Sequence, residues 1–242
     1  MATRKTFPSL DLAECVAVNG NSFKDNILQT SANMLRFWKK TAPNWNYSPV
    51  MSAVPDIISK ATSINQAIQT CSKSHSDIGR SQNQEVASLL YNEFFEKKIT
   101  AFRTKAVRLR LPYGSSLSTI IRPATVIWDG IQSKVLMLQP RKGYSVPIEV
   151  WARYNWLVEQ STLIGETAGL SIIYADCSKG VSGEREFCVF DAETLPKISS
   201  KDAEYFVRIA VEAFEMALPN APAPDKIRRD ETAKILPLFP EL

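Results

Sequence analysis

The hydrophobic pattern changes period within residues 118–177, the most informative part of the chain. Two β-type runs, 118–128 (STIIRPATVIW) and 134–139 (KVLMLQ), are separated by the dipeptide Asp129-Gly130. Asp-Gly between such runs is typical of a two-residue hairpin, because both central residues of its turn need φ > 0. The pattern therefore predicts an antiparallel hairpin.

A helical period follows this hairpin. Val146, Val150, Tyr154 and Leu157 recur at intervals of three to four residues, which predicts a helix over residues 146–164. The short apolar run LSIIY at 170–174 then predicts a buried strand that extends to residue 175.

The remaining pattern predicts helices before and after this unit. Ser81 and Gln84 have the spacing of a capping box and predict the start of a helix over 83–98. Pro55 suits the first position of a helix that runs to Cys71. The further predictions are a helix at 22–40, a connection at 41–54, a basic strand at 102–111, a strand at 185–190, and a helix at 201–218 capped by Ser200.

These elements predict an α+β fold, in the broader sense an α/β protein, with a mixed central sheet flanked by helices. We expect the strands at 102–111, 118–128, 134–139 and 170–175 to form one sheet, with the helices 83–98 and 146–164 packed on it. The predicted organisation is an N-terminal helical layer at 1–80, an α/β core at 81–218 and an extended, proline-rich C-terminal arm at 219–242.

Composition narrows the class of protein. The 242 residues are 45% hydrophobic and 22% charged, and no apolar run approaches the length that a membrane span requires. The first residues lack the apolar segment of an export signal, so we expect a cytoplasmic location and no membrane partner. The four cysteines form no CxxC pair, which disfavours a zinc site and favours buried thiols in a reducing compartment.

Basic residues cluster in two places, although the net charge is only +4. The candidate nucleic-acid-binding residues are Arg103, Lys105, Arg108, Arg110, Arg141 and Lys142. On a strand, Arg108 and Arg110 share one face, and Arg103 and Lys105 share the other. The clusters permit binding to phosphates, but an edge strand protected by charge has the same pattern.

Aromatic residues gather in the helix that follows the hairpin. Trp151, Tyr154 and Trp156 lie beside Arg153. Core packing is the favoured interpretation for Trp156 and one of the other two rings, and stacking of an exposed Trp151, with Arg153, on bases or on a partner protein is the alternative.

The order helix, three strands, helix, strand over residues 82–218 resembles the core of the PD-(D/E)XK nuclease-like superfamily, in particular its RecB-type branch. The resemblance implies a restriction-endonuclease-like core and phosphodiester hydrolysis that depends on divalent cations held by carboxylates. Active members carry an aspartate on the second core strand, a (D/E)-x-K triplet at the end of the third, and often a glutamate on the preceding helix.

The resemblance places substituted residues at these catalytic positions. Ala124 stands at the aspartate, Gln139 at the acidic residue of the triplet and Arg141 at the lysine, while Glu85 matches the helical glutamate. Alanine removes a charged ligand, glutamine offers only a neutral oxygen, and arginine has too high a pKa for proton transfer. We therefore expect a degenerate site with no bound metal.

A migrated site is the alternative. Asp129 lies in the same hairpin, so a site of Asp129, Gln139 and Lys142 with Glu149 nearby can be written, and Glu85 with Asp129 would then ligate Mg²⁺. The Asp-Gly turn explains Asp129 better, because it places this residue at the hairpin tip. Some members of the family also hold an iron–sulfur cluster through three cysteines after the core. Only Cys177 and Cys188 follow the core here, so no such cofactor is expected.

The sequence thus favours a non-catalytic, nuclease-like protein that acts as an interaction module. The partner classes are nucleic acid, bound weakly and without sequence preference, and another protein. The competing hypotheses are an active Mg²⁺-dependent DNA nuclease with a migrated or incomplete site, and a resemblance of fold alone without shared function. The sequence does not indicate the oligomeric state.

Overall fold

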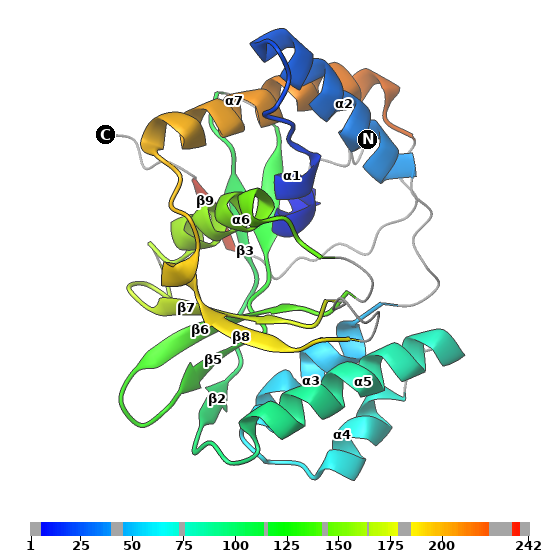
Figure 1. The fold of residues 1–242 in the computed structure, drawn as a ribbon, viewed down its shortest axis with the longest axis vertical. Coiled ribbons are helices and arrows are strands. Elements are labelled where there is room, and N and C mark those ends of the chain that lie inside the picture. The colour runs from blue at the N-terminus through cyan, green and yellow to red at the C-terminus, as the bar shows by residue number, and fades with distance from the viewer. Residues whose placement is uncertain are drawn as a thin grey trace.

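The computed structural model describes residues 6–39, 46–72, 76–113, 116–141, 145–163, 165–178, 185–222 and 234–237. Helices and two mixed sheets make up this part of the chain, which confirms the predicted α+β class (Figure 1). The helices are α1 (Ser9–Cys15), α2 (Phe23–Lys39), α3 (Ser48–Ile58), α4 (Ile64–Cys71), α5 (Asp77–Phe94), α6 (Ile148–Ser161) and α7 (Ser200–Ala217), with short 3-10 turns at Ala192–Thr194 and Leu218–Asn220.

The strands divide between two sheets, so the expectation of one sheet is wrong. A four-stranded sheet has the order β1 (Thr6–Pro8), β4 (Ser118–Ile121), β3 (Val107–Arg110) and β9 (Lys234–Pro237). A five-stranded sheet has the order β2 (Thr100–Phe102), β5 (Thr125–Trp128), β6 (Ser133–Gln139), β7 (Ser171–Asp176) and β8 (Cys188–Asp191).

Both long runs that the sequence predicts as single strands change sheet midway. The run 118–128 breaks between Ile121 and Thr125, and Pro123 in the break has no N–H to donate to a ladder. The run 102–111 breaks between Phe102 and Val107. Because β4 pairs with β3 and β5 pairs with β2, the two broken strands bend together from one sheet into the other.

The predicted hairpin is present as β5 and β6, but its turn is wider than expected. Gly130 has a positive φ of 95°, whereas Asp129 does not. The Asp129 carboxylate instead accepts hydrogen bonds from the N–H groups of Ile131 and Gln132, both at 2.9 Å. This side-chain bonding to the backbone closes a four-residue loop without a second residue at positive φ.

Helix α6 follows the hairpin and precedes a strand, as the sequence predicts, and it connects β6 to β7, which pair in parallel. Gln139 at the end of β6 is in register with Asp176 at the end of β7. The carboxyl ends of parallel strands meet at one edge of a sheet, which makes this edge a usual place for a functional site.

Two apolar cores cover the two faces of the five-stranded sheet. The larger contains residues of α1, α2, α6 and α7, and the smaller contains residues of α3, α4 and α5. The helices of the first 80 residues are therefore shared between the cores, with α2 against α7 and both α3 and α4 against α5 (Figure 1).

Helix boundaries in this region differ from the predictions. Pro55 lies inside α3, so α3 occupies much of the expected connection. The following helix α4 starts directly after Ser63, which forms a capping box with Gln66. Ser76, not Ser81, caps α5, and Ser199, not Ser200, caps α7. Several residues of each predicted helix could accept the first free N–H groups, and the pattern alone does not choose among them.

Strand β1 and helix α1 were not predicted, because they are short and the first strand pairs with distant residues at β4. In the predicted C-terminal arm, residues 234–237 form β9 and pair in parallel with β3. Among the described helices, none has the length and apolar character needed to cross a membrane.

Candidate functional site

Gln139 ends β6 with its side chain buried. Strand alternation places it on the same face as Val135 and Met137, which belong to the larger core. Its Oε1 accepts a hydrogen bond from the N–H of Arg141 at 3.3 Å. Its Nε2 is buried and meets no acceptor among the described residues.

Ala124 lies on the opposite face from Gln139. It belongs to the smaller core, and its N–H donates to the carbonyl of Leu136 at 2.8 Å. The predicted catalytic positions 124 and 139 therefore do not face a common volume.

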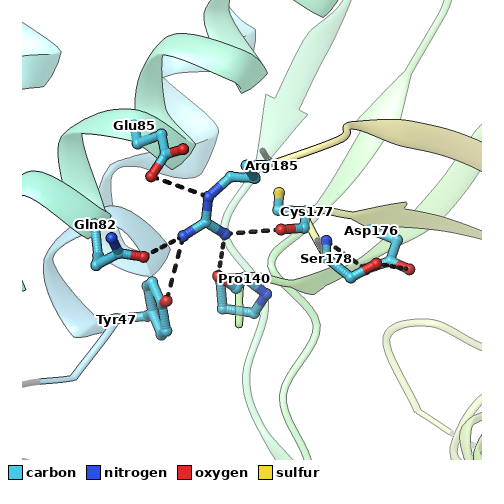
Figure 2. A network of polar contacts seen from close by, with 8 residues as sticks. All are labelled: Tyr47, Gln82, Glu85, Pro140, Asp176, Cys177, Ser178 and Arg185. Carbon is cyan, nitrogen blue, oxygen red and sulfur yellow. Dashed lines mark hydrogen bonds and ion pairs between the residues drawn. The ribbon is translucent and has the colours of Figure 1, made fainter. Parts of the chain in front are cut away.

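Glu85 lies on α5, and its partner is an arginine that the sequence did not single out. The carboxylate Oε2 is 3.3 Å from the Nε of Arg185 (Figure 2). The side chain of Arg185 is 1% exposed and that of Glu85 is 30% exposed, so the guanidinium is shielded from water and the carboxylate is partly shielded. A shielded pair is costly to break, because the remaining charge has no solvent to stabilise it.

Four further acceptors surround the Arg185 guanidinium. Nη1 donates to the carbonyls of Pro140 at 2.6 Å and Cys177 at 2.8 Å. Nη2 donates to Gln82 Oε1 at 2.6 Å and to the Tyr47 hydroxyl at 3.5 Å. Figure 2 shows the guanidinium between α5 and the ends of β6 and β7, where it joins these elements.

Arg141 takes part in a second ion pair, on the α1 side of the sheet. One guanidinium nitrogen lies 2.8 and 2.9 Å from the two carboxylate oxygens of Asp11, which is buried at the start of α1. Glu14 is 3.7 Å from another nitrogen of the same group. The predicted lysine position thus binds carboxylates of the chain itself.

Asp176 adds a carboxylate beside Gln139. It accepts hydrogen bonds from the backbone N–H and the hydroxyl of Ser178, at 3.0 and 3.1 Å (Figure 2). Burial raises the pKa of Asp176 above its usual range, although the Ser178 bonds act in the opposite direction. Burial at this position thus disfavours the charged form of the carboxyl.

The residues of the migrated site are not brought together. Asp129 is in the hairpin loop before β6, whereas Gln139 is the last residue of that seven-residue strand. A strand of this length spans roughly 20 Å. Glu149 is exposed in the first turn of α6, and Lys142 lies outside the described residues. In the described part of the chain, no group of three or more His, Cys, Asp or Glu is arranged to hold a metal ion.

The predicted basic residues have different surroundings. Arg103 turns toward α3, where it bonds to Asp56 at 2.9 Å and to the carbonyl of Ser52 at 3.2 Å. Arg108 and Arg110 flank the buried Leu109 on β3, so they lie on the face opposite the larger core. Lys105 is exposed between β2 and β3.

The arginine on α6 and the aromatic cluster are buried. Trp151 packs edge-to-face on Tyr174 and Phe190, with centroids 5.0 and 5.4 Å apart, and this confirms core packing for Trp151. Arg153 is also buried, and burial lowers its pKa. Trp156, for which the sequence also favoured core packing, packs against the larger core but is only half-buried.

The buried thiols fit the structural interpretation of the cysteines. Burial raises the pKa of Cys177 to about 12, that of Cys15 to about 12 and that of Cys71 to about 11. Thiols with such values remain protonated at neutral pH, and a protonated, buried thiol is a poor nucleophile. Cys188 is exposed on β8.

Sequence reasoning missed three residues at this edge: Arg185, Asp11 and Asp176. Asp176 had a signal, since it is an acid directly after a buried aliphatic strand. Arg185 follows a polar loop rich in Gly and Ser, and Asp11 lies in a segment with no predicted element. In the sequence, neither Arg185 nor Asp11 can be told apart from a charged residue exposed to solvent.

No family model matches the sequence, and no curated protein matches it. Among solved structures, one similar chain is that of "Crystal structure of SSO0001". The two chains are 12% identical, with 81% of this chain and 87% of that chain covered and a TM-score of 0.28. A likeness at this level carries no argument about family or function.

Proposed function

We propose that the protein is a non-catalytic interaction module on a nuclease-like α+β scaffold, and that its ligand is nucleic acid held weakly through phosphates. The observation that supports a non-catalytic role is the position of Arg185. Its guanidinium lies between Glu85 and the ends of β6 and β7, so a cation of the chain itself occupies the surroundings of the one expected acidic ligand. A metal ion there would have to compete with a shielded arginine that several acceptors hold in place.

Two arginines on β3 support nucleic acid as the ligand. Arg108 and Arg110 lie on one face of the four-stranded sheet, away from the larger core. The Nε of Arg108 is buried and meets no acceptor among the described residues. Arg108 as a whole is only half-buried and Arg110 is exposed, and a guanidinium binds phosphate well because its donors match the oxygens in geometry.

A binding assay with a matched control tests the ligand. A labelled DNA or RNA strand of about 20 nucleotides in about 20 mM salt should show weak binding by fluorescence anisotropy, and its affinity should fall steeply as salt rises. Arg108→Gln should lower the affinity and flatten the salt slope by about one unit, because one phosphate contact is lost. Arg103→Gln is the control, since this guanidinium is held at Asp56 and Ser52.

Three outcomes would contradict the proposal in different ways. No binding of any nucleic acid at low salt would exclude this ligand and favour a protein partner. Equal loss in Arg108→Gln and Arg103→Gln would place the binding surface elsewhere than on β3. Cleavage of DNA by the wild-type protein with Mg²⁺ or Mn²⁺, lost in Glu85→Gln, would show an active nuclease.

A further inference from the structure

A pocket of about 460 Å³ lies between α6 and α7. The second half of α6 and the first turns of α7 form two of its walls, and Tyr113, which follows β3, forms the third. Its lining residues are Tyr113, Trp156, Gln160, Ser200, Ala203 and Glu204. Its volume is in the range of sites that hold small ligands or a large side chain.

Tyr113 has a strained backbone conformation. Its φ is 66°, in the left-handed region that a bulky aromatic residue rarely adopts. The residue is 54% exposed, so burial in the core does not account for this conformation. Strain of this kind gathers at sites where a side chain must be held in a particular direction. Here Tyr113 lines the pocket.

The ring of Tyr113 is held against a carboxylate. Its hydroxyl shares a hydrogen bond with Glu204, and the pKa of Tyr113 is raised, by burial first and then by the charge of Glu204. The hydroxyl therefore stays protonated and can donate this bond at neutral pH. Arg208 acts on the same hydroxyl in the opposite direction.

Trp156 forms the second aromatic wall. It packs edge-to-face on Phe206 of α7, with ring centroids 6.3 Å apart and an interplanar angle of 85°. The larger core therefore supports the half-buried indole from beneath, while the indole also lines the pocket. Two aromatic rings and the carboxylate of Glu204 thus meet at one cavity.

Glu204 is the charged residue among those that line the pocket, and the nearby Arg208 has other partners. Arg208 stacks over the ring of Phe23 at 5.1 Å and pairs with Glu212 at 3.7 Å. The positive end of α7 is offset by Asp202 in its first turn. Lys201 and Arg208 line an adjacent depression, which shares Glu204 with this pocket.

We propose that this pocket binds an organic cation, namely an alkylated ammonium group. The negative faces of Tyr113 and Trp156 would attract the cation, and Glu204 would supply the opposite charge. Aromatic rings combined with a carboxylate are a known solution for such groups, because alkylated ammonium is too weakly hydrated and too bulky for ordinary hydrogen bonding. This site is separate from the surface proposed for nucleic acid.

Choline and its neutral carbon analogue 3,3-dimethylbutanol give the most direct test, because they share their shape and differ in charge. We expect choline to shift the indole N–H resonance of Trp156 in NMR titration, and the neutral analogue to bind about tenfold more weakly. A peptide with trimethyl-lysine, compared with its unmethylated form, distinguishes a partner's side chain from a free small molecule as the source of the cation.

Variants separate the contributions of the walls. Trp156→Leu and Glu204→Gln should each weaken choline binding several-fold, Tyr113→Phe should weaken it less, and Trp128→Leu, at the hairpin end of β5, should leave it unchanged. Circular dichroism checks the fold of each variant. Equal affinity for choline and the neutral analogue, tighter binding of benzoate than of choline, or full binding by folded Glu204→Gln would overturn the proposal, as would the absence of any choline response.

Discussion

Two arginines at the same edge of the five-stranded sheet have opposite surroundings. Arg185, on the α5 side, is 1% exposed and contacts five groups from four parts of the chain. Arg141, on the α1 side, is 41% exposed and pairs with two carboxylates of one short helix. The buried guanidinium therefore joins elements that are distant in sequence, whereas the exposed one fixes a single helix. Burial and the number of distinct partners, rather than charge alone, decide how much each arginine contributes to the free energy of unfolding.

The largest expected effect is that of removing Arg185. Arg185→Ala should lower the free energy of unfolding by about 3 kcal/mol or more, because the buried carbonyls of Pro140 and Cys177 lose their donor. Arg185→Lys should recover only part of this, since one ammonium cannot reach all the acceptors. Urea denaturation measures the change.

The matched control for this prediction is Arg103→Ala. Its guanidinium is 65% exposed and pairs with Asp56 on the surface. Loss of this surface pair in Arg103→Ala should lower the free energy of unfolding by at most about 1 kcal/mol. Equal destabilisation of the two variants would mean that the Arg185 contacts do not hold the sheet edge and α5 together.

A smaller effect is expected at Arg141. Arg141→Ala should lower the free energy of unfolding by about 1–3 kcal/mol, because the buried Asp11 carboxylate is left without its donor. A double-mutant cycle with Asp11→Asn isolates this pair from other changes. A coupling energy near zero in the cycle would contradict a bonded pair in solution.

The smallest effect concerns the pH dependence of stability. Burial raises the pKa of Asp176, so the native state retains a proton that the unfolded chain loses first. The contribution of Asp176 to the free energy of unfolding is thus fully present below the pKa of the unfolded chain. It is lost as pH rises through the raised pKa of the native state. Asp176→Asn should therefore raise the free energy of unfolding at neutral pH and change it little below about pH 4.

Asp129→Asn provides a control of opposite sign. Hydrogen bonds from the backbone of Gln132 and Ile131 lower the pKa of Asp129, so its charged form is favoured in the native state. That contribution is present above the usual pKa and is lost as pH falls through the lowered value. Thermal unfolding across pH should show opposite trends for the two variants, and parallel trends would contradict the assigned environments.

Local features of this fold could be predicted from the sequence, and its long-range pairing could not. The hairpin of β5 and β6 and the helix α6 depend on neighbouring residues, so their patterns were sufficient. The change of sheet between Ile121 and Thr125 depends on pairing with β1, β2 and β3, and a continuous apolar run does not show it. Pro123 was the local sign of that break.

The site was harder to predict for the same reason. Position along the chain identified Glu85, Gln139 and Arg141 as site residues. Glu85, however, pairs with Arg185 on one face of the sheet, whereas Gln139 and Arg141 lie on the other face. Arg185 is about 100 residues from Glu85 in sequence, and nothing local marks it as buried. Only the packing of α5 against the strand ends brings the two together.

Binding of Mn²⁺, followed by electron paramagnetic resonance, tests the proposed non-catalytic role most directly. Because Arg185 is paired to Glu85, we expect the wild-type protein and Glu85→Gln to bind Mn²⁺ equally and only at millimolar concentration, as ordinary surface carboxylates do. Micromolar Mn²⁺ binding by the wild-type protein that Glu85→Gln abolishes, accompanied by Mn²⁺-dependent DNA cleavage, would contradict it.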